Sequence, residues 1–454
     1  MKKKEASLFC RVVLLIAISG FLSSCGCSET KVTQEAQVAP EVQYRKLSLE
    51  DYEDKVAGGW LGQAIGVLFA GPTEFLWPGE MVPFDLEDWY TMKPEIMAEA
   101  APFLEKGDWA AMMEIKKKYK NDKNNWQTYT PTIMSNQDDL YIEFLFLHSI
   151  QKNGLDVTGK QMAEDWVKYL EPRQIWGANK AAYENFKKGV WPPESGRHPN
   201  SNLGNAIDFQ IESDLFGLIS PGMPRVSNAW ADKAGHIMNY GDGVYAGMAM
   251  DAMYGEAFFE SDPRKLVEYS LKVIPAESGY AEMVRDVIAA HDRSPDDWQA
   301  AWREIHVKWG KNLGLDVRTN GAYVYLGLLY GNGEIWKTMN VSMRSGLDSD
   351  CNPSSSAGIV GTALGLSGIP EKWAMLRNLP IDNSSFFGGG STLKEIYPNP
   401  ISWDDILDAT VEVGKKNILA NGGKIENGTI YIPHRTPTVP PLEQVVLGEI
   451  PQPE

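Results

Sequence analysis

The feature that most constrains the fold is an uncharged stretch, residues 56–70, in which glycines recur at helical spacing. Gly58, Gly62 and Gly66 are four residues apart, so on a helix they form a smooth ridge where a second backbone can approach closely. In a bilayer the same pattern would mark a dimer seam. The stretch is short for a membrane span, however, and charged residues precede it. We therefore expect a buried core helix.

A second Gly/Ala-rich stretch, Ala357–Gly365, has the same character. Asn352 and Pro353 ahead of it predict a helix cap and a preset first helical residue. Ser48 is the predicted N-cap of the first helix. We expect these two small-faced helices to lie side by side in the centre of the molecule.

The rest of the chain is predominantly helical in pattern. Strand signals are scarce, and the best is the segment 424–432 with Asn427-Gly428 as its hairpin turn. The sequence predicts an all-α fold in one domain, with a small β element near the C-terminus and no repeat that would favour a solenoid. Helices are predicted over residues 140–151, 159–170, 229–258, 263–273, 281–291, 295–309 and 404–421.

The N-terminus reads as an export signal. Three lysines at positions 2–4 precede an apolar run over residues 12–22 that is too short for a comfortable membrane span. Residues 22–25 resemble a bacterial lipobox, which implies a signal peptide over 1–24, lipid on Cys25, and a chain anchored to a membrane and facing the periplasm or the cell surface. An ordinary secretory signal or an uncleaved anchor is the alternative. Residues 25–46 are a predicted flexible tether, 47–454 the domain, and 433–454 its extended Pro-rich tail.

The charge and cysteine content of the chain limit the kinds of partner that it can bind. The chain carries a net charge of −17, and loss of residues 1–24 removes four basic residues and one acidic residue, giving −20. Such acidity argues against nucleic acid, because phosphate contacts need clustered Lys and Arg. Only Cys27 and Cys351 remain outside the signal and the lipid site, so a disulfide framework is excluded. We expect a small-molecule or glycan substrate, and membrane contact through the lipid anchor only.

Two short acidic motifs lie far apart in the chain. The first is Asn136-Gln137-Asp138-Asp139, and the second is Asp348-Ser349-Asp350-Cys351-Asn352; each stands just ahead of a predicted helix. For either motif alone, helix capping is the better explanation. Facing each other, however, they offer more carboxylate oxygens than capping requires. They could then hold one or two hard divalent cations.

Several motifs in one order strengthen this hypothesis. The segment 49–379 resembles the ADP-ribosylglycohydrolase family in its opening motif, in an acidic motif early in the chain and in a closing motif with its helix. The matching segments are Asp54–Gly66, Pro72–Phe75, Gln137–Asp139, Gly346–Asn352, Ala357–Gly358 and Gly368–Trp373. Each is weak alone, but the set is specific.

The resemblance implies an all-α orthogonal bundle around two Mg²⁺ ions and hydrolysis of a glycosidic bond to a ribosyl group. When the family motifs are matched to this sequence, the metal ligands would be Asp138, Asp139, Asp348 and Asp350. Glu74 would lie near the scissile bond or guard the metals. Paired carboxyls commonly cleave glycosides, so Glu74 with Asp139 or Asp348 could act as acid and base.

The chain departs from the family pattern at three positions. Gln137 replaces a Thr ligand, although its amide oxygen can still bind Mg²⁺. Cys351 replaces a Thr or Ser ligand, and a thiol suits softer ions than Mg²⁺. Val67 stands where many relatives have Asp. We expect Mg²⁺ or Mn²⁺, as one or two ions, with Gln137 and Cys351 completing the ligand set.

Three further residues are predicted to face the substrate: His236, Asn239 and Asn320. A core or capping role is the alternative for His236, and helix capping for Asn320. The function that these patterns and the resemblance favour is metal-dependent hydrolysis of a glycosidic bond in a glycan, glycoside or ribosyl compound outside the cytoplasm. The rival interpretation is a carbohydrate-binding lipoprotein that has lost turnover through the changes at Gln137 and Cys351.

Overall fold

The computed structural model describes residues 42–443, apart from residues 105, 107, 136, 312–313 and 385–392. The predicted signal peptide, Cys25, most of the tether and the end of the tail lie outside the described residues. The domain forms one compact unit. Among the described helices, none combines the length and apolarity that crossing a bilayer requires.

The described chain is dominated by helices, with short strands at its edges. The elements are α1 (Leu49–Ala70), α2 (Pro94–Leu104), α3 (Trp109–Tyr119), α4 (Asp138–Asn153), α5 (Gly159–Tyr169), α6 (Gly177–Lys187), α7 (Asp208–Ile211), α8 (Asp214–Leu218), α9 (Pro224–Gly235), α10 (Asp242–Ala257), α11 (Pro263–Ser270), α12 (Gly279–Arg293), α13 (Trp298–Trp309), α14 (Val317–Gly331), α15 (Ile335–Arg344), α16 (Cys351–Leu364), α17 (Glu371–Ala374), α18 (Trp403–Ala420), β1 (Tyr44–Ser48), β2 (Tyr90–Met92), β3 (Trp126–Thr128), β4 (Met134–Ser135), β5 (Ile381–Asp382), β6 (Lys424–Glu426) and β7 (Thr429–Pro433). The predicted all-α fold is confirmed.

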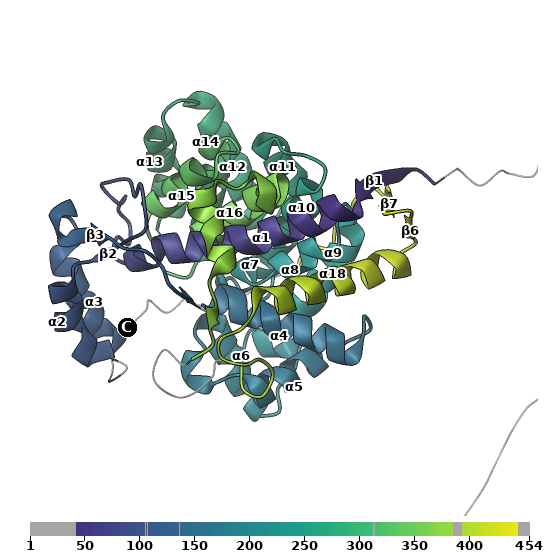
Figure 1. The fold of residues 1–454 in the computed structure, drawn as a ribbon, viewed down its shortest axis with the longest axis horizontal. Coiled ribbons are helices and arrows are strands. Elements are labelled where there is room, and N and C mark those ends of the chain that lie inside the picture. The colour runs from purple at the N-terminus through teal and green to yellow at the C-terminus, as the bar shows by residue number, and fades with distance from the viewer. Residues whose placement is uncertain are drawn as a thin grey trace, which may run out of the picture. The chain divides into compact units, whose positions relative to one another are not determined.

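Helices α1 and α16 lie side by side through the centre, and their contact is made by glycines (Figure 1). A Cβ atom added at Gly58 would lie 2.2 Å from the carbonyl oxygen of Gly361. At Gly62 it would lie 2.3 Å from that of Ala357, and at Gly66 2.3 Å from that of Pro353. No side chain fits between backbones this close. We call this contact the glycine seam, and it confirms the predicted pairing of the two small-faced helices.

Other helices wrap the seam. In Figure 1, α10 to α15 lie on one side of α1, and α4, α5, α6 and α18 lie on the other. The Lys55 ammonium fixes one end, because it donates to the carbonyls of Ala257, Thr362 and Ala363 at 3.2, 3.3 and 2.7 Å. These carbonyls end α10 and α16, where a cation is favourable. Both helices are thereby held in register with α1.

The strands form three small sheets. β7 pairs antiparallel with β1 and with β6, and Asn427-Gly428 makes the turn of the predicted hairpin. β1 begins at Tyr44, so ordered structure starts before the predicted domain boundary at Leu47. The antiparallel β2–β3 pair and the parallel β4–β5 pair were not predicted. The sheet of β1, β6 and β7 lies at the margin of the helical core (Figure 1).

Most of the predicted helices agree with the structure to within three residues at either end. The predicted helix over 229–258 is wrong, because the chain breaks between α9 and α10, where Gly241 takes φ +59°. The predicted start of α16 at Pro353 is also wrong: the helix begins at Cys351 with Asp350 as its N-cap. Pro353 is tolerated inside this first turn because its missing N–H would have no helical partner there.

Candidate metal centre

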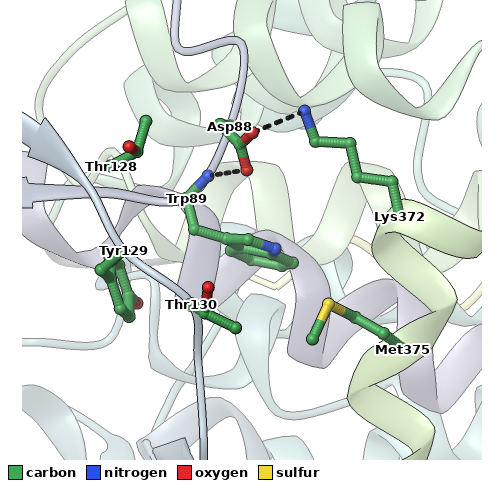
Figure 2. Close-up of a pocket in the computed structure, with 7 residues that line it drawn as sticks. All are labelled: Asp88, Trp89, Thr128, Tyr129, Thr130, Lys372 and Met375. Atoms are coloured by element: carbon green, nitrogen blue, oxygen red, sulfur yellow. Dashed lines mark hydrogen bonds and ion pairs between the residues drawn. The ribbon is translucent and has the colours of Figure 1, made fainter.

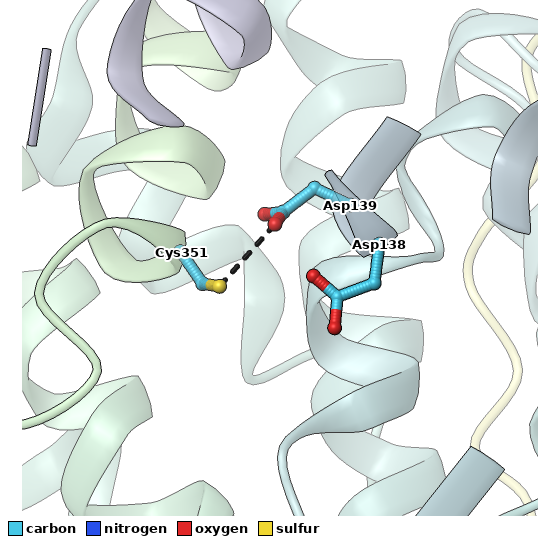
Figure 3. A group of neighbouring side chains, drawn as sticks. All are labelled: Asp138, Asp139 and Cys351. Carbon is cyan, nitrogen blue, oxygen red and sulfur yellow. Dashed lines mark hydrogen bonds between the residues drawn. The ribbon is translucent and has the colours of Figure 1, made fainter. Parts of the chain in front are cut away.

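Two helix starts meet in the folded chain. Asp138 and Asp139 open α4, whereas Asp348 and Asp350 directly precede α16, which Cys351 opens. The ligand atoms of Asp138, Asp139 and Cys351 lie within 4.8 Å of one another, as do those of Asp348, Asp350 and Cys351. Figure 3 shows the two α4 aspartates facing Cys351. We call these five residues the acidic centre.

Helix capping does not explain these residues. The N-caps of α4 and α16, Gln137 and Asp350, make no side-chain capping hydrogen bond. Asp139 is fully buried and Asp350 is 3% exposed, yet one carboxylate oxygen of each, Oδ1, has no hydrogen-bond partner. A buried carboxylate oxygen without a partner is costly unless it meets a cation or keeps a proton.

The electrostatics of the acidic centre also indicate a site for cations or protons. Burial, and then the charge of Asp138, raise the pKa of Asp139 to about 8, although the Cys351 thiol donates a hydrogen bond to it at 3.2 Å. Burial and neighbouring carboxylates raise the pKa of Asp348 and of Asp350 well above the ordinary value. Divalent cations would take the place of these protons, so the residues present fit a Mg²⁺ or Mn²⁺ site.

Glu74 follows a short 3₁₀ turn after α1 and is tied to the acidic centre by its neighbours. The Thr73 and Ser349 hydroxyls lie 2.8 Å apart, and the Phe75 N–H donates to the Leu347 carbonyl at 3.0 Å. Burial, and then the charge of Asp350, raise the pKa of Glu74 well above the ordinary value. Glu74 is therefore a carboxyl that can hold a proton beside the acidic centre.

The sequence prediction missed a cation at this site. Lys116, on α3, is only 8% exposed. Burial lowers its pKa, whereas the charges of Glu74 and Asp350 raise it. In the sequence it opens the run Lys116–Lys118, which reads as a solvated helix face, so only the packing of α3 identifies it as a site residue.

A comparison with known protein families shows where the chain belongs. A sequence model of the family described as ADP-ribosylglycohydrolase matches residues 48–389. The chain belongs to the ADP-ribosylglycohydrolase family. Membership of this family indicates a hydrolase that acts on a glycosidic bond, and the family generally uses divalent metals.

A solved structure described as an ADP-ribosylglycohydrolase-related protein complex is similar to this family member. The similarity has a TM-score of 0.49 at 13% sequence identity, and it covers 81% of this chain and 99% of that chain. No curated protein matches the chain.

The structure shows the surroundings of two residues that depart from the ADP-ribosylglycohydrolase pattern, Cys351 and Gln137. Cys351 lies at the junction of both ligand groups, where its thiol is a donor to Asp139. Burial and the surrounding carboxylates raise the pKa of this thiol well above the ordinary value. Gln137 directly precedes Asp138, and its carbonyl accepts from the N–H of Leu140 at 2.9 Å. Metal ligation by Gln137 and Cys351 stays a prediction.

The predicted substrate-facing residues divide into two groups. The Oδ1 of Asn320 accepts from Asn352 at 3.1 Å, next to Cys351 at the start of α16. His236 instead ends α9 and contacts Glu443 at 2.8 Å. Asn239 is fully buried and donates to the carbonyls of a loop, residues 203–206. The contacts that the structure records for His236 and Asn239 are therefore structural, and a substrate role for them stays a prediction.

A second layer of buried acids lies behind the acidic centre. The Gln63 amide donates to Asp214 at 3.0 Å and to the Asp139 carbonyl at 3.4 Å. Glu143, one turn after Asp139, accepts from the N–H of Leu215 at 3.1 Å. These bonds join α1, α4 and α8, so they fix the helix turn that presents Asp138 and Asp139. Gln63 belongs to the motif predicted from sequence, whereas Asp214 was missed.

A separate hollow of about 440 Å³ lies between the β2–β3 segment and α17 (Figure 2). Asp88 and Lys372 form an ion pair of 3.1 Å beside it. None of its lining residues belongs to the acidic centre. They are Asp88, Trp89, Thr128, Tyr129, Thr130, Lys372 and Met375.

Proposed function

We propose that this protein is a divalent-metal-dependent hydrolase that cleaves a glycosidic bond in a glycan, glycoside or ribosyl compound outside the cytoplasm. The observation that carries the proposal is the acidic centre, in which buried carboxylates from two distant helix starts converge on Cys351. Family membership supplies the reaction class.

Asp138, Asp139, Asp348 and Asp350 would hold Mg²⁺ or Mn²⁺, as one or two ions. When bound, the metal would supply Lewis-acid charge that orients vicinal sugar hydroxyls and a water molecule. The unpartnered oxygens of Asp139 and Asp350 support this assignment. Gln137 and Cys351 would complete the ligand set.

Glu74 would hold and move the proton that glycoside cleavage requires. Its carboxyl lies beside Asp350, and its raised pKa keeps it protonated at a higher pH than an ordinary glutamate. Such a carboxyl can protonate a leaving oxygen near neutral pH. Asp139 or Asp348 would be the second carboxyl of the pair.

The substrate class follows from the proposed export of the protein. We propose that residues 1–24 are a lipoprotein signal, that Cys25 carries lipid, and that the mature chain faces the periplasm or the cell surface. ADP-ribosylated proteins are made from cytoplasmic NAD, so a glycan or glycoside is the better substrate class. Metabolic labelling with a fatty-acid analogue tests the anchor: wild type should be labelled and Cys25→Ala should not.

Hydrolysis of a panel of 4-nitrophenyl pentosides and hexosides, with an ADP-ribosyl substrate, tests the activity. We expect turnover with added Mg²⁺ or Mn²⁺ and none with EDTA, and we expect Asp138→Ala and Asp350→Ala to be inactive while remaining folded. Saccharide binding without turnover under any metal would instead favour the carbohydrate-binding lipoprotein.

A further inference from the structure

The short helix α7 packs directly on the acidic centre. Ile207 and Ile211, one helical turn apart, form a small buried cluster with Cys351. Asp208 and Glu212 each follow one of these isoleucines in the chain. The packing of the isoleucines on Cys351 places α7, and with it both acids, against the start of α16.

Asn179, on α6, holds the two carboxylates together. Its backbone N–H donates to Oδ1 of Asp208 at 3.0 Å, and its side-chain amide donates to Oε1 of Glu212. Asp208, Glu212 and Asn179 are 6%, 0% and 3% exposed. Their remaining oxygens, Oδ2 of Asp208, Oε2 of Glu212 and Oδ1 of Asn179, have no protein partner. Three buried acceptors therefore lack donors.

The pair is near enough to the acidic centre for the charges of that centre to act on it. Burial and the charges of Asp208, Asp138 and Asp139 raise the pKa of Glu212. In the described part of the chain, Glu212 is paired with the Asn179 amide rather than with a basic side chain.

We propose that Asp208, Glu212 and Asn179 form a substrate subsite, the α7 subsite, that accepts hydrogen bonds from the hydroxyls of a neutral sugar ring. This inference rests on the proposed hydrolase function and narrows its substrate class. Vicinal hydroxyls are donors that match paired acceptor oxygens. The three side chains offer a diphosphate no cation, so the α7 subsite favours a neutral sugar over an ADP-ribosyl substrate.

Steady-state kinetics with saturating Mn²⁺ test the subsite. In wild type, the best neutral 4-nitrophenyl glycoside should exceed ADP-ribosyl-arginine in kcat/KM by at least tenfold. Glu212→Gln should raise KM for that glycoside about tenfold, the size of a lost hydrogen bond, and change kcat less. Asp208→Asn should act in the same direction. A preference for ADP-ribosyl-arginine, or an unchanged KM in both variants, would overturn the subsite.

A matched control is Asp165→Asn. Asp165 is also buried and accepts a hydrogen bond from Ser149 at 2.8 Å, but it lies on α5 and is outside the acidic centre. This variant should lower the melting temperature and leave KM unchanged. Glu212→Gln should keep the melting temperature, because the amide oxygen can still accept the hydrogen bond from Asn179.

The failure of the proposed function is distinguishable from the failure of the subsite. If no substrate is turned over, the hydrolase proposal fails, and saturation-transfer NMR with the free pentoses and hexoses then tests the α7 subsite by itself. Signal transfer in wild type that is lost in Glu212→Gln supports the subsite. Equal transfer in both proteins, or none in wild type, overturns it.

Discussion

The glycine seam and the acidic centre meet at the start of α16, and they are stabilised in opposite ways. Along the seam, backbones meet at distances that only glycine permits, and Lys55 satisfies the carbonyls at its end. At the acidic centre, where α16 begins, buried carboxylates keep unpartnered oxygens and raised pKa values. A fully packed seam thus supports a site that is complete only with protons or cations.

The largest effect should come from pH, and it should be confined to the acidic centre. The pKa of Asp139 is raised from 3.8 to about 8. The folded protein therefore keeps a proton that the unfolded chain releases near pH 3.8. This contribution to stability is present below pH 3.8 and is lost as the pH rises through 8.

Without metal, the free energy of unfolding should therefore fall by about 1.4 kcal/mol per pH unit for each such proton between about pH 5 and 8. Urea denaturation with EDTA measures this slope. Asp139→Asn should make it shallower, and excess Mn²⁺ should flatten it because metal binding displaces the protons. Equal slopes in wild type and Asp139→Asn would contradict the buried charges described here.

A slightly smaller effect should come from the seam. In Gly62→Ala the new Cβ would lie 2.3 Å from the Ala357 carbonyl oxygen, a backbone atom that cannot rotate away. We expect the free energy of unfolding to fall by about 3 kcal/mol, at every pH and with or without metal. Gly71→Ala is the control, because a Cβ there meets nothing within 4 Å. Equal stability of the two variants would refute the close backbone contact.

The contrast between the two regions also explains how far the sequence alone could reach. Gly58, Gly62 and Gly66 recur at about one helical turn, so the sequence alone predicts that they form one smooth helix face. The pairing of the two seam helices was therefore predictable. The acidic centre was predictable because its aspartates stand in recognisable motifs. Asp208 and Glu212 carry no such motif: a pair of acids four residues apart becomes part of the proposed subsite only because Ile207 and Ile211 pack on Cys351.

Asp350→Asn should separate stability from metal binding. It removes one buried charge, so the metal-free protein should gain about 1 to 2 kcal/mol in free energy of unfolding. The rise in melting temperature on adding Mn²⁺ should disappear, because a ligand is lost. Asp404→Asn is the control, since the Asp404 side chain is 72% exposed and should leave both quantities unchanged. If the metal-free variant is more stable but Mn²⁺ still raises its melting temperature as in wild type, the metal binds elsewhere.

The smallest effect should come from Lys116, the cation that faces the acidic centre from α3. Its charge lowers the pKa of Glu74, against the raising effects of burial and of Asp350. In Lys116→Met the limb of the pH–rate profile that Glu74 sets should therefore move to higher pH, by about half to one unit. Lys117→Met removes an adjacent charge that instead pairs with Glu114 at the surface. Its profile should match wild type, and identical shifts in both variants would mean that Lys116 acts only through the overall charge of the protein.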